Sequence, residues 1–193
     1  MPRYANFKKY RKGRFFAAKV LIGTRSMVQI SLLSDSHSHI DVAILKHLKG
    51  SDEIWHAGDI GDLKTAQKLQ NIAPLRAVYG NIDGQELRQE FPLNNSFEIE
   101  GLKVLMTHIA GYPNKYNGRA KKLLSDLKPD LFICGHSHIL KVMRDPQFGH
   151  MHMNPGAIGL QGFHQVRTLL QFKIEKGKIS ELAVAEWPRW PKN

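Results

Sequence analysis

Five short β-type runs in this chain are each followed at once by residue types that bind metal ions. In chain order the motifs that follow them are Asp35-Ser36-His37, Gly58-Asp59, Gly80-Asn81-Ile82-Asp83, His108 and Gly135-His136-Ser137-His138. Side chains so far apart in sequence can meet only if the strand ends lie together at one edge of the fold. The pattern therefore predicts sheets with a metal site at their carboxyl ends.

Strand and helix signals alternate at first, and strand signals dominate later. We expect strands at 28–33, 53–56, 75–79, 97–99, 104–107, 131–134, 139–143, 150–153, 166–174 and 179–185. We expect helices at 40–48, 62–72 and 116–127, and the last of these should bury a stripe formed by Tyr116, Ala120, Leu123, Leu124 and Leu127. This order of elements predicts an α/β fold in which two sheets pack face to face with helices outside.

Positive charge is concentrated at the start of the chain. The net charge is +11, but residues 1–26 hold eight of the 28 Lys and Arg residues and no acidic residue. We interpret 1–26 as a basic and poorly structured N-terminal extension, and 27–193 as one domain. The alternative interpretation of the extension is an arm that contacts nucleic acid or anionic lipid.

Cysteine content and hydropathy suggest the compartment. Cys134 is the only cysteine, so an intramolecular disulfide is excluded, which suits a reducing, cytoplasmic setting. No unbroken apolar stretch has the length of a membrane span. We therefore expect a cytoplasmic protein.

The candidate ligands form a mixed set of carboxylate, amide and imidazole groups. Such a set suits Mn²⁺, Fe, Zn²⁺, Co²⁺ or Ni²⁺ better than Ca²⁺. A carboxylate such as Asp59 can bridge two cations and reduce their mutual repulsion. Two ions about 3.5–4 Å apart can hold a hydroxide near neutral pH and neutralise phosphoryl oxygens. The residues therefore favour phosphoester chemistry.

The ordered motifs resemble those of the calcineurin-like metallophosphoesterase superfamily, whose pattern is D-x-H, G-D, G-N-H-(D/E), H and G-H-x-H. The match covers about residues 28–157, and Asn154-Pro155-Gly156-Ala157 corresponds to the family's N-P-G-S. The chain is most similar to the small bacterial and archaeal phosphodiesterases of the YfcE type, because it is compact and lacks a cap or insert.

The resemblance implies a four-layer αββα sandwich of two mixed β-sheets flanked by helices, with two divalent metal ions. Mn²⁺ is the common ion of the family, and Ni²⁺, Fe, Zn²⁺ or Co²⁺ are alternatives. One ion would be held by Asp35, His37, Asp59 and His138. The other would be held by Asp59, Asn81, His108 and His136. The resemblance gives Asp59, Asn81 and His108 a catalytic role through these ions.

Two positions depart from the family pattern. Ile82 stands where many members carry a His that serves as a general acid or stabilises the transition state. Loss of such a group costs roughly 10²–10³-fold in rate, so diesters or esters with good leaving groups are favoured over unactivated monoesters. Ser38 and His39 stand where a Gly is common, and His39 is a candidate substitute proton donor.

Several other residues receive structural or weaker functional interpretations. Asp83 is expected to support Asn81 or the turn that follows, and His56 is expected to be buried or to support the ligands. His152 is a candidate for reaching the site, because it is close to Asn154 in sequence. The other histidines outside the motifs receive structural interpretations: His47, His150 and His164. The loop 109–119 could contact a substrate through Tyr112, Lys115, Tyr116 and Arg119.

The sequence thus predicts a dinuclear metal-dependent phosphoesterase, foremost a phosphodiesterase with a metal-bridging hydroxide as nucleophile. A phosphodiester small molecule or a nucleotide is the expected substrate, and nucleic acid is less favoured. Two alternatives stay open: a catalytically silent interaction scaffold on the same fold, and a nuclease that uses the basic arm. The sequence does not predict an oligomeric state.

Overall fold

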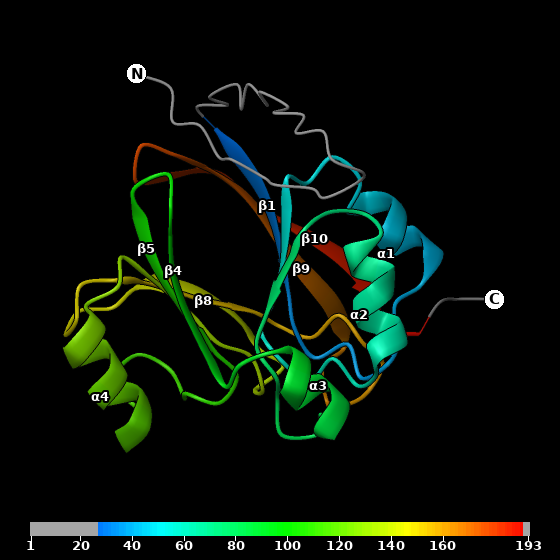
Figure 1. The fold of residues 1–193 in the computed structure, drawn as a ribbon, viewed down its shortest axis with the longest axis horizontal. Helices are drawn as coiled ribbons and strands as arrows, with labels where there is room; N and C mark the ends of the chain where they lie inside the picture. Colours follow the sequence, from blue (N-terminus) through cyan, green and yellow to red (C-terminus); the bar gives the residue numbers. More distant parts are fainter. Residues whose placement is uncertain (1–26, 191–193) are drawn as a thin grey trace, which may run out of the picture.

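The computed structural model describes residues 27–190. The basic extension at 1–26 lies outside the described residues, as do residues 191–193, so the predicted domain organisation stays a prediction. Ten strands and four helices form two five-stranded sheets with helices on their outer sides (Figure 1). Within residues 27–190, no helix has the length and hydrophobicity needed to cross a membrane.

The first sheet has the strand order β10-β9-β1-β2-β3. Its strands are β1 (Val28–Leu33), β2 (Glu53–His56), β3 (Leu75–Ala77), β9 (Val166–Glu175) and β10 (Lys178–Pro188). β1, β2 and β3 are parallel, whereas β9 and β10 form an antiparallel hairpin beside β1. The turn of this hairpin contains Gly177 at a φ of 74°.

The second sheet has the strand order β4-β5-β6-β8-β7. Its strands are β4 (Asn94–Ile99), β5 (Leu102–Thr107), β6 (Leu131–Ile133), β7 (Leu140–Arg144) and β8 (Met151–Pro155). β5, β6 and β8 are parallel and central, and the antiparallel β4 and β7 form the edges. Both sheets are therefore mixed.

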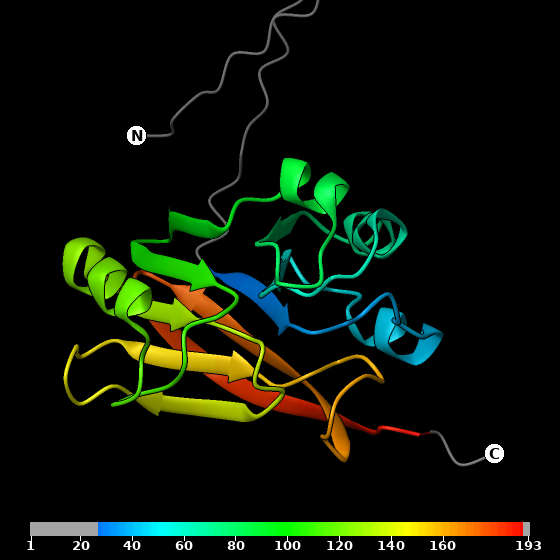
Figure 2. The same cartoon turned by 90° about the horizontal axis from the view of Figure 1, so that it is seen from below.

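The four helices are α1 (Val42–His47), α2 (Leu63–Gln70), α3 (Gln85–Glu90) and α4 (Gly118–Leu127). Asp41, Asp62 and Asn117 cap the first, second and fourth, since each side chain accepts a hydrogen bond from a backbone N–H of the first turn. Figure 2 shows α4 on one side of the pair of sheets and α1 and α2 on the other.

Successive side chains of a strand point to opposite faces of its sheet, and this alternation accounts for the layers. On β5, Val104 and Met106 face the core between the sheets, while Leu105 between them packs under α4. On β9, Leu170 and Phe172 face the same central core, and Leu169 faces the cluster under α1 and α2. Each sheet thus buries both faces, which confirms the four-layer αββα sandwich.

Several element bounds differ by a few residues from those expected, and three differences concern α3 and α4. The helix α3 was not expected, because the segment is polar and only Leu87 in it is buried. In α4, Leu127 is exposed rather than part of the buried stripe. Tyr116 is buried but lies before the N-cap of the helix. In α4, Ala120 and Leu124 are buried and Leu123 is partly buried, so the face that contacts the sheet ends before Leu127.

The parallel strands bring the motifs together. Asp35 follows β1, Asp59 follows β2, and Asn81 follows β3, all at the carboxyl ends of the first sheet's parallel strands. His108 follows β5, and His136 follows β6, at the equivalent ends in the second sheet. Packing of the two sheets therefore places both sets of loops at one common edge.

Candidate metal centre

The loops at this edge have an unusual backbone. Five of the seven predicted ligands have positive φ values between 46° and 68°, a region that costs non-glycine residues roughly 1–3 kcal/mol each. They are Asp35, His37, Asp59, His136 and His138. Such conformations persist only where the surrounding structure imposes them, and they gather at functional sites.

Two glycines in the motifs allow the loops to approach one another closely. A Cβ atom at Gly80 would collide with the Asp59 carboxylate, and one at Gly58 would collide with the His108 ring. Gly58 also has a φ of 95°, which a side chain would strain. The glycines that precede Asp59 and Asn81 are therefore required by close packing of the ligand loops.

The predicted ligands form two neighbouring groups. In each group the candidate ligand atoms all lie within 4.8 Å of one another, as three or more ligands of one cation require. The first group comprises Asp35, His37 and His138. The second group comprises Asp59, His108 and His136.

Asp59 reaches both groups with different oxygens. Its Oδ2 lies 3.7 Å from His37 Nε2, and its Oδ1 lies 3.3 Å from His108 Nε2. Asn81 joins the second group, because its Oδ1 lies 3.2 Å from His108 Nε2. The structure therefore brings together the seven residues that the sequence singled out.

Asp35 is the buried centre of the first group. Its Oδ1 lies 3.2 Å from His138 Nε2, and its Oδ2 accepts a hydrogen bond from the His136 backbone N–H at 3.1 Å. The His37 and His138 rings meet edge to face, with centroids 5.4 Å apart. One carboxylate thus links the loop after β1 to the loop after β6.

The orientation of His108 is set by its other ring nitrogen. Nδ1 donates to the Ala57 carbonyl at 2.8 Å, which leaves the Nε2 lone pair facing Asp59 and Asn81. Burial lowers the pKa of His108, but the carboxylates of Asp59 and Asp35 outweigh it, so the pKa is raised overall. Burial raises the pKa of Asp59, yet His108 more than offsets this and the pKa is lowered. The site therefore favours positive charge between these groups.

Asp83 fixes the spacing of two ligand loops. Its carboxylate accepts hydrogen bonds from three backbone N–H groups, those of Ile60, Gly61 and Gly80, at 3.2, 2.7 and 2.7 Å. The first two N–H groups follow Asp59, and the third precedes Asn81. The structure accordingly gives Asp83 the supporting place expected from the sequence.

The donor set fits divalent cations. Asp35 Oδ1 and His37 Nε2 are buried and have no hydrogen-bond partner within the described part of the chain. A buried acceptor without a partner costs roughly 1–3 kcal/mol, and a charged one costs more. A cation between the groups would satisfy both atoms, and carboxylate, amide and imidazole ligands suit Mn²⁺, Fe, Co²⁺, Ni²⁺ or Zn²⁺.

Other candidate residues lie at different distances from the two groups. His39 belongs to neither group, and its Nε2 is 4.0 Å from an oxygen of Asp41, so its catalytic role stays a prediction. His56 is buried and bonds Ser36 Oγ at 2.9 Å. Burial lowers the pKa of His56 to about 4, so His56 is a neutral support beneath the loop after β1.

Two histidines differ from their expected places. His152 does not reach the groups, because its Nδ1 bonds the buried Tyr116 hydroxyl at 2.9 Å under α4. His164 lies beside the site, with its ring centroid 5.3 Å from that of His138. Its Nε2 donates to the Gly159 carbonyl at 3.0 Å. No motif spacing signals this contact, since the loop before β9 delivers His164 only in the folded chain.

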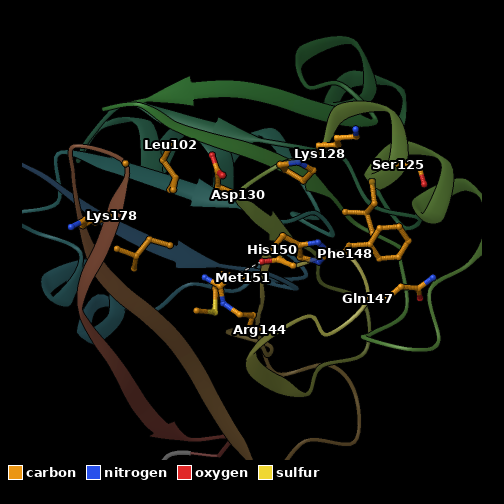
Figure 3. Close-up of a pocket in the computed structure, with 15 residues that line it drawn as sticks. Leu102, Ser125, Lys128, Asp130, Arg144, Gln147, Phe148, His150, Met151 and Lys178 are labelled. Atoms are coloured by element: carbon orange, nitrogen blue, oxygen red, sulfur yellow. Dashed lines mark hydrogen bonds between the residues drawn. The ribbon is translucent and has the colours of Figure 1, made fainter.

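Two pockets share residues with the ligand groups. One, of about 350 Å³, includes Asn81 and His108. The other, of about 510 Å³, includes His136, His138 and His164. A larger pocket of about 830 Å³ lies elsewhere, at the amino end of β8 and the end of α4 (Figure 3). Figure 3 labels the side chains at that pocket, among them Lys128, Phe148 and His150, and none of the candidate ligands lines it.

Comparison with known proteins identifies the family. Residues 28–177 match the calcineurin-like phosphoesterase superfamily domain, so the chain belongs to this superfamily. A probable metallophosphoesterase of Methanothermobacter thermautotrophicus is 32% identical over 114 residues, which are 56% of this chain and 66% of that protein. A probable metallophosphoesterase of Methanocaldococcus jannaschii is 28% identical over 115 residues, which are 56% of this chain and 58% of that protein. The matched region thus spans less than two thirds of either relative.

A solved structure supports the fold. Wild-type Vps29 from Entamoeba histolytica complexed with Zn²⁺ is 16% identical, with a TM-score of 0.64. The match covers 83% of this chain and 99% of that chain. At this identity the likeness concerns the fold alone.

Proposed function

We propose that this protein is a metal-dependent phosphodiesterase with a two-ion site. The observation that carries the proposal is the position of Asp59, whose two oxygens face His37 in one ligand group and His108 in the other. A shared carboxylate between two clusters suits a pair of closely spaced cations. Membership of the superfamily and similarity to two archaeal probable metallophosphoesterases support the same reaction class.

The chain's own residues have distinct tasks in this proposal. Asp35, His37, Asp59 and His138 would hold one ion, and Asp59, Asn81, His108 and His136 would hold the other. Bound there, two divalent ions supply polarisation of the phosphoryl group and a lowered pKa for water. The Ala57 carbonyl keeps His108 Nε2 available as a ligand, and Asp83 holds the loops of Asp59 and Asn81 in register. Mn²⁺ is the proposed ion, and Zn²⁺, which the fold neighbour from Entamoeba carries, is an alternative.

Preference for diesters follows from position 82. The Ile82 backbone N–H donates to Asp59 Oδ1 at 3.1 Å, so residue 82 adjoins the proposed site. Its aliphatic side chain cannot donate a proton to a leaving oxygen. Ester bonds with good leaving groups are therefore the proposed substrates, because they need least help from a general acid.

A catalytically silent scaffold is the second candidate. The observation that favours it is a pair of large apolar side chains beside the ligand groups. These are Ile139 and Phe163, which are 66% and 99% exposed. An exposed apolar pair of this kind suits a protein partner as well as a substrate.

The decisive experiment combines metal analysis with turnover. We expect purified protein loaded with Mn²⁺ to bind two ions and to hydrolyse bis-p-nitrophenyl phosphate faster than p-nitrophenyl phosphate. Asp59→Asn should lower metal affinity and turnover at least about 100-fold, because it removes the shared carboxylate. Asp126→Asn on the exposed side of α4 is the matched control. Loaded protein that is inert toward both esters would favour the scaffold, and full activity of Asp59→Asn would disprove the assignment of the site.

A further inference from the structure

The pocket beside Asn81 and His108 has a composition suited to an anionic ligand. Its volume is about 350 Å³, enough for a short organic group. Two of its lining residues are arginines, and no acidic residue lines it. The pocket therefore joins a cationic wall to one of the two ligand groups.

Both guanidinium groups are held by neutral partners. Arg88 Nε donates to the Asp83 carbonyl at 2.7 Å, and the guanidinium lies over the Tyr79 ring at 4.8 Å from its centroid. Arg119 donates to the Ile109 carbonyl at 2.6 Å and to Thr107 Oγ1 at 3.1 Å. Among residues 27–190, no acidic side chain forms an ion pair with either arginine. Their charges are thus fixed in position but not neutralised.

A held guanidinium without an acidic partner is an anion receptor. Guanidinium groups bind carboxylate and phosphate through paired N–H donors, and less conformational freedom is lost when the side chain is already positioned. The two arginines come from different elements, α3 and the first turn of α4, so no single solvated helix face accounts for both. Leu93 and Ile109, which are 41% and 38% exposed, add apolar surface between the arginines and the ligand group.

We infer that this pocket binds the organic arm of the substrate and that this arm ends in a carboxylate or a second phosphate. The inference rests on the proposed function, since it places the scissile phosphoryl group at the neighbouring ligand groups. The substrate class is then a phosphodiester in which one alcohol is short, partly apolar and anionic at its far end. Arg119 and Arg88 would select it over a diester with an uncharged arm.

A matched pair of chromogenic diesters tests the inference. One substrate is p-nitrophenyl ethyl phosphate, and the other is p-nitrophenyl 2-carboxyethyl phosphate, so the leaving group is the same and only the carboxylate differs. We expect kcat/KM to be about 10- to 100-fold higher for the carboxylated diester, the range of one or two charge-assisted hydrogen bonds. Arg119→Gln should reduce this ratio to near one. Each arginine also bonds a carbonyl at or beside a candidate ligand, so the readout is the ratio of the two diesters within one variant and not the absolute rate.

Arg144→Gln is the matched control. Arg144 lies on β7, donates to the Gly149 carbonyl and lines the larger, distant pocket. Arg144→Gln removes the same net charge as Arg119→Gln. A general attraction of anions to a basic protein would therefore weaken equally in both variants. Retention of the substrate preference in Arg144→Gln and its loss in Arg119→Gln would support the inference. An equal kcat/KM for the two diesters in wild-type protein would overturn it while leaving the proposed function intact.

Binding without turnover keeps the inference separate from the proposed hydrolysis. Calorimetric titration would compare 2-carboxyethyl phosphate with ethyl phosphate on protein as purified. We expect about tenfold tighter binding of the carboxylated probe, lost in Arg119→Gln and retained in Arg144→Gln. If neither diester is hydrolysed, the proposed function fails, and the titration alone decides about the pocket. Equal binding of the two probes would refute the pocket assignment.

Discussion

At the scale of single residues, the supports of the site are as informative as the candidate ligands. The Asp83 carboxylate accepts hydrogen bonds from three backbone N–H groups of two loops, so it holds these loops together and belongs to neither ligand group. His56 likewise bonds Ser36 in the loop after β1, and the Ala57 carbonyl accepts a hydrogen bond from His108. Positions of this kind explain how five strained backbone conformations are maintained at one edge of the fold.

Asp83→Asn is expected to weaken both the fold and the ion site. The amide presents N–H groups to backbone N–H groups, so at least one buried hydrogen bond is lost at a cost of about 2–3 kcal/mol. For a domain of this size the melting temperature should fall by about 4–10 °C. Metal affinity should fall about 10- to 100-fold, as for other groups that position ligands. Thermal denaturation and metal titration check this, and a variant with unchanged melting temperature and affinity would contradict it.

Asp126→Asn is the control for this change. Asp126 pairs with Lys122 on the exposed side of α4, with 2.9 Å between Nζ and Oδ2. An exposed pair of this type contributes less than about 0.5 kcal/mol. The same acid-to-amide substitution should therefore leave the melting temperature within about 2 °C of wild type.

Ile82→His should restore help for poor leaving groups. Ile82 is 45% exposed and adjoins Asp59, so a histidine side chain can extend into solvent there without displacing buried neighbours. Because a positioned general acid matters most for a poor leaving group, hydrolysis of a dialkyl phosphate should rise about tenfold or more. The rate of bis-p-nitrophenyl phosphate hydrolysis should rise less, because its leaving group is good. Ile82→Asn is the polar control without a titrating group, and an equal effect of both substitutions would exclude proton donation.

At the scale of elements, the two ends of α4 differ in how favourably they are capped. Its N-terminus is capped by Asn117, whose Oδ1 accepts the Ala120 N–H at 2.8 Å. Its C-terminus ends at Lys128 in the left-handed region, with φ 45° and ψ 59°. Glycine is the usual residue at such a position, because a Cβ atom is strained there.

Lys128→Gly is expected to stabilise the protein slightly. Relief of the left-handed strain exceeds the added entropy of the unfolded glycine, for a net gain of about 0.5–1 kcal/mol. Lys121→Gly in the middle of the same helix is the matched control and should cost about 1 kcal/mol. Chemical denaturation of both variants measures the difference. A destabilised Lys128→Gly variant would show that the lysine side chain makes a stabilising contact.

Element boundaries were predictable where local signals are strong. The sequence predicted β1 and β2 with their observed bounds, since apolar runs there end at polar motifs. It missed α3, whose residues are almost all polar. It extended the buried stripe of α4 to Leu127, because helical periodicity does not reveal where the sheet beneath a helix ends.

At the scale of the whole molecule, buried neutral histidines couple folding to pH. Burial lowers the pKa of His152 to about 4, with further lowering by His150 and Lys141. The unfolded chain therefore binds more protons than the folded one between about pH 4 and pH 6.5. Stability is fully present above this window and is lost as the pH falls through it.

His152→Gln should flatten this dependence. The amide can still bond the Tyr116 hydroxyl but cannot take up a proton, so one titrating group is removed. Between pH 5 and pH 6 the slope of unfolding free energy against pH should decrease by about 1.2 kcal/mol per pH unit. Urea denaturation at the two pH values measures it. Equal slopes in the variant and wild-type protein would show that His152 is not buried in its neutral form.

The sequence by itself determined the order of the strands, the family and the seven candidate ligands. It could do so because each ligand follows a strand directly, and because a carboxyl end of a parallel strand is a fixed place in an α/β fold. It also indicated that Asp83 supports the ligand loops rather than joining them. These properties are local in sequence and need no knowledge of packing.

Only the tertiary structure decided which side chains share a group and what surrounds them. Packing of the two sheets brings the loops after β5 and β6 against the loops after β1 and β2, so Asp59 reaches His37 and His108 at once. The same packing moved His152 under α4, set His164 beside His138, and aligned two arginines from separate helices along one pocket. Contacts between residues far apart in sequence depend on how the sheets pack, and no spacing within the chain encodes them.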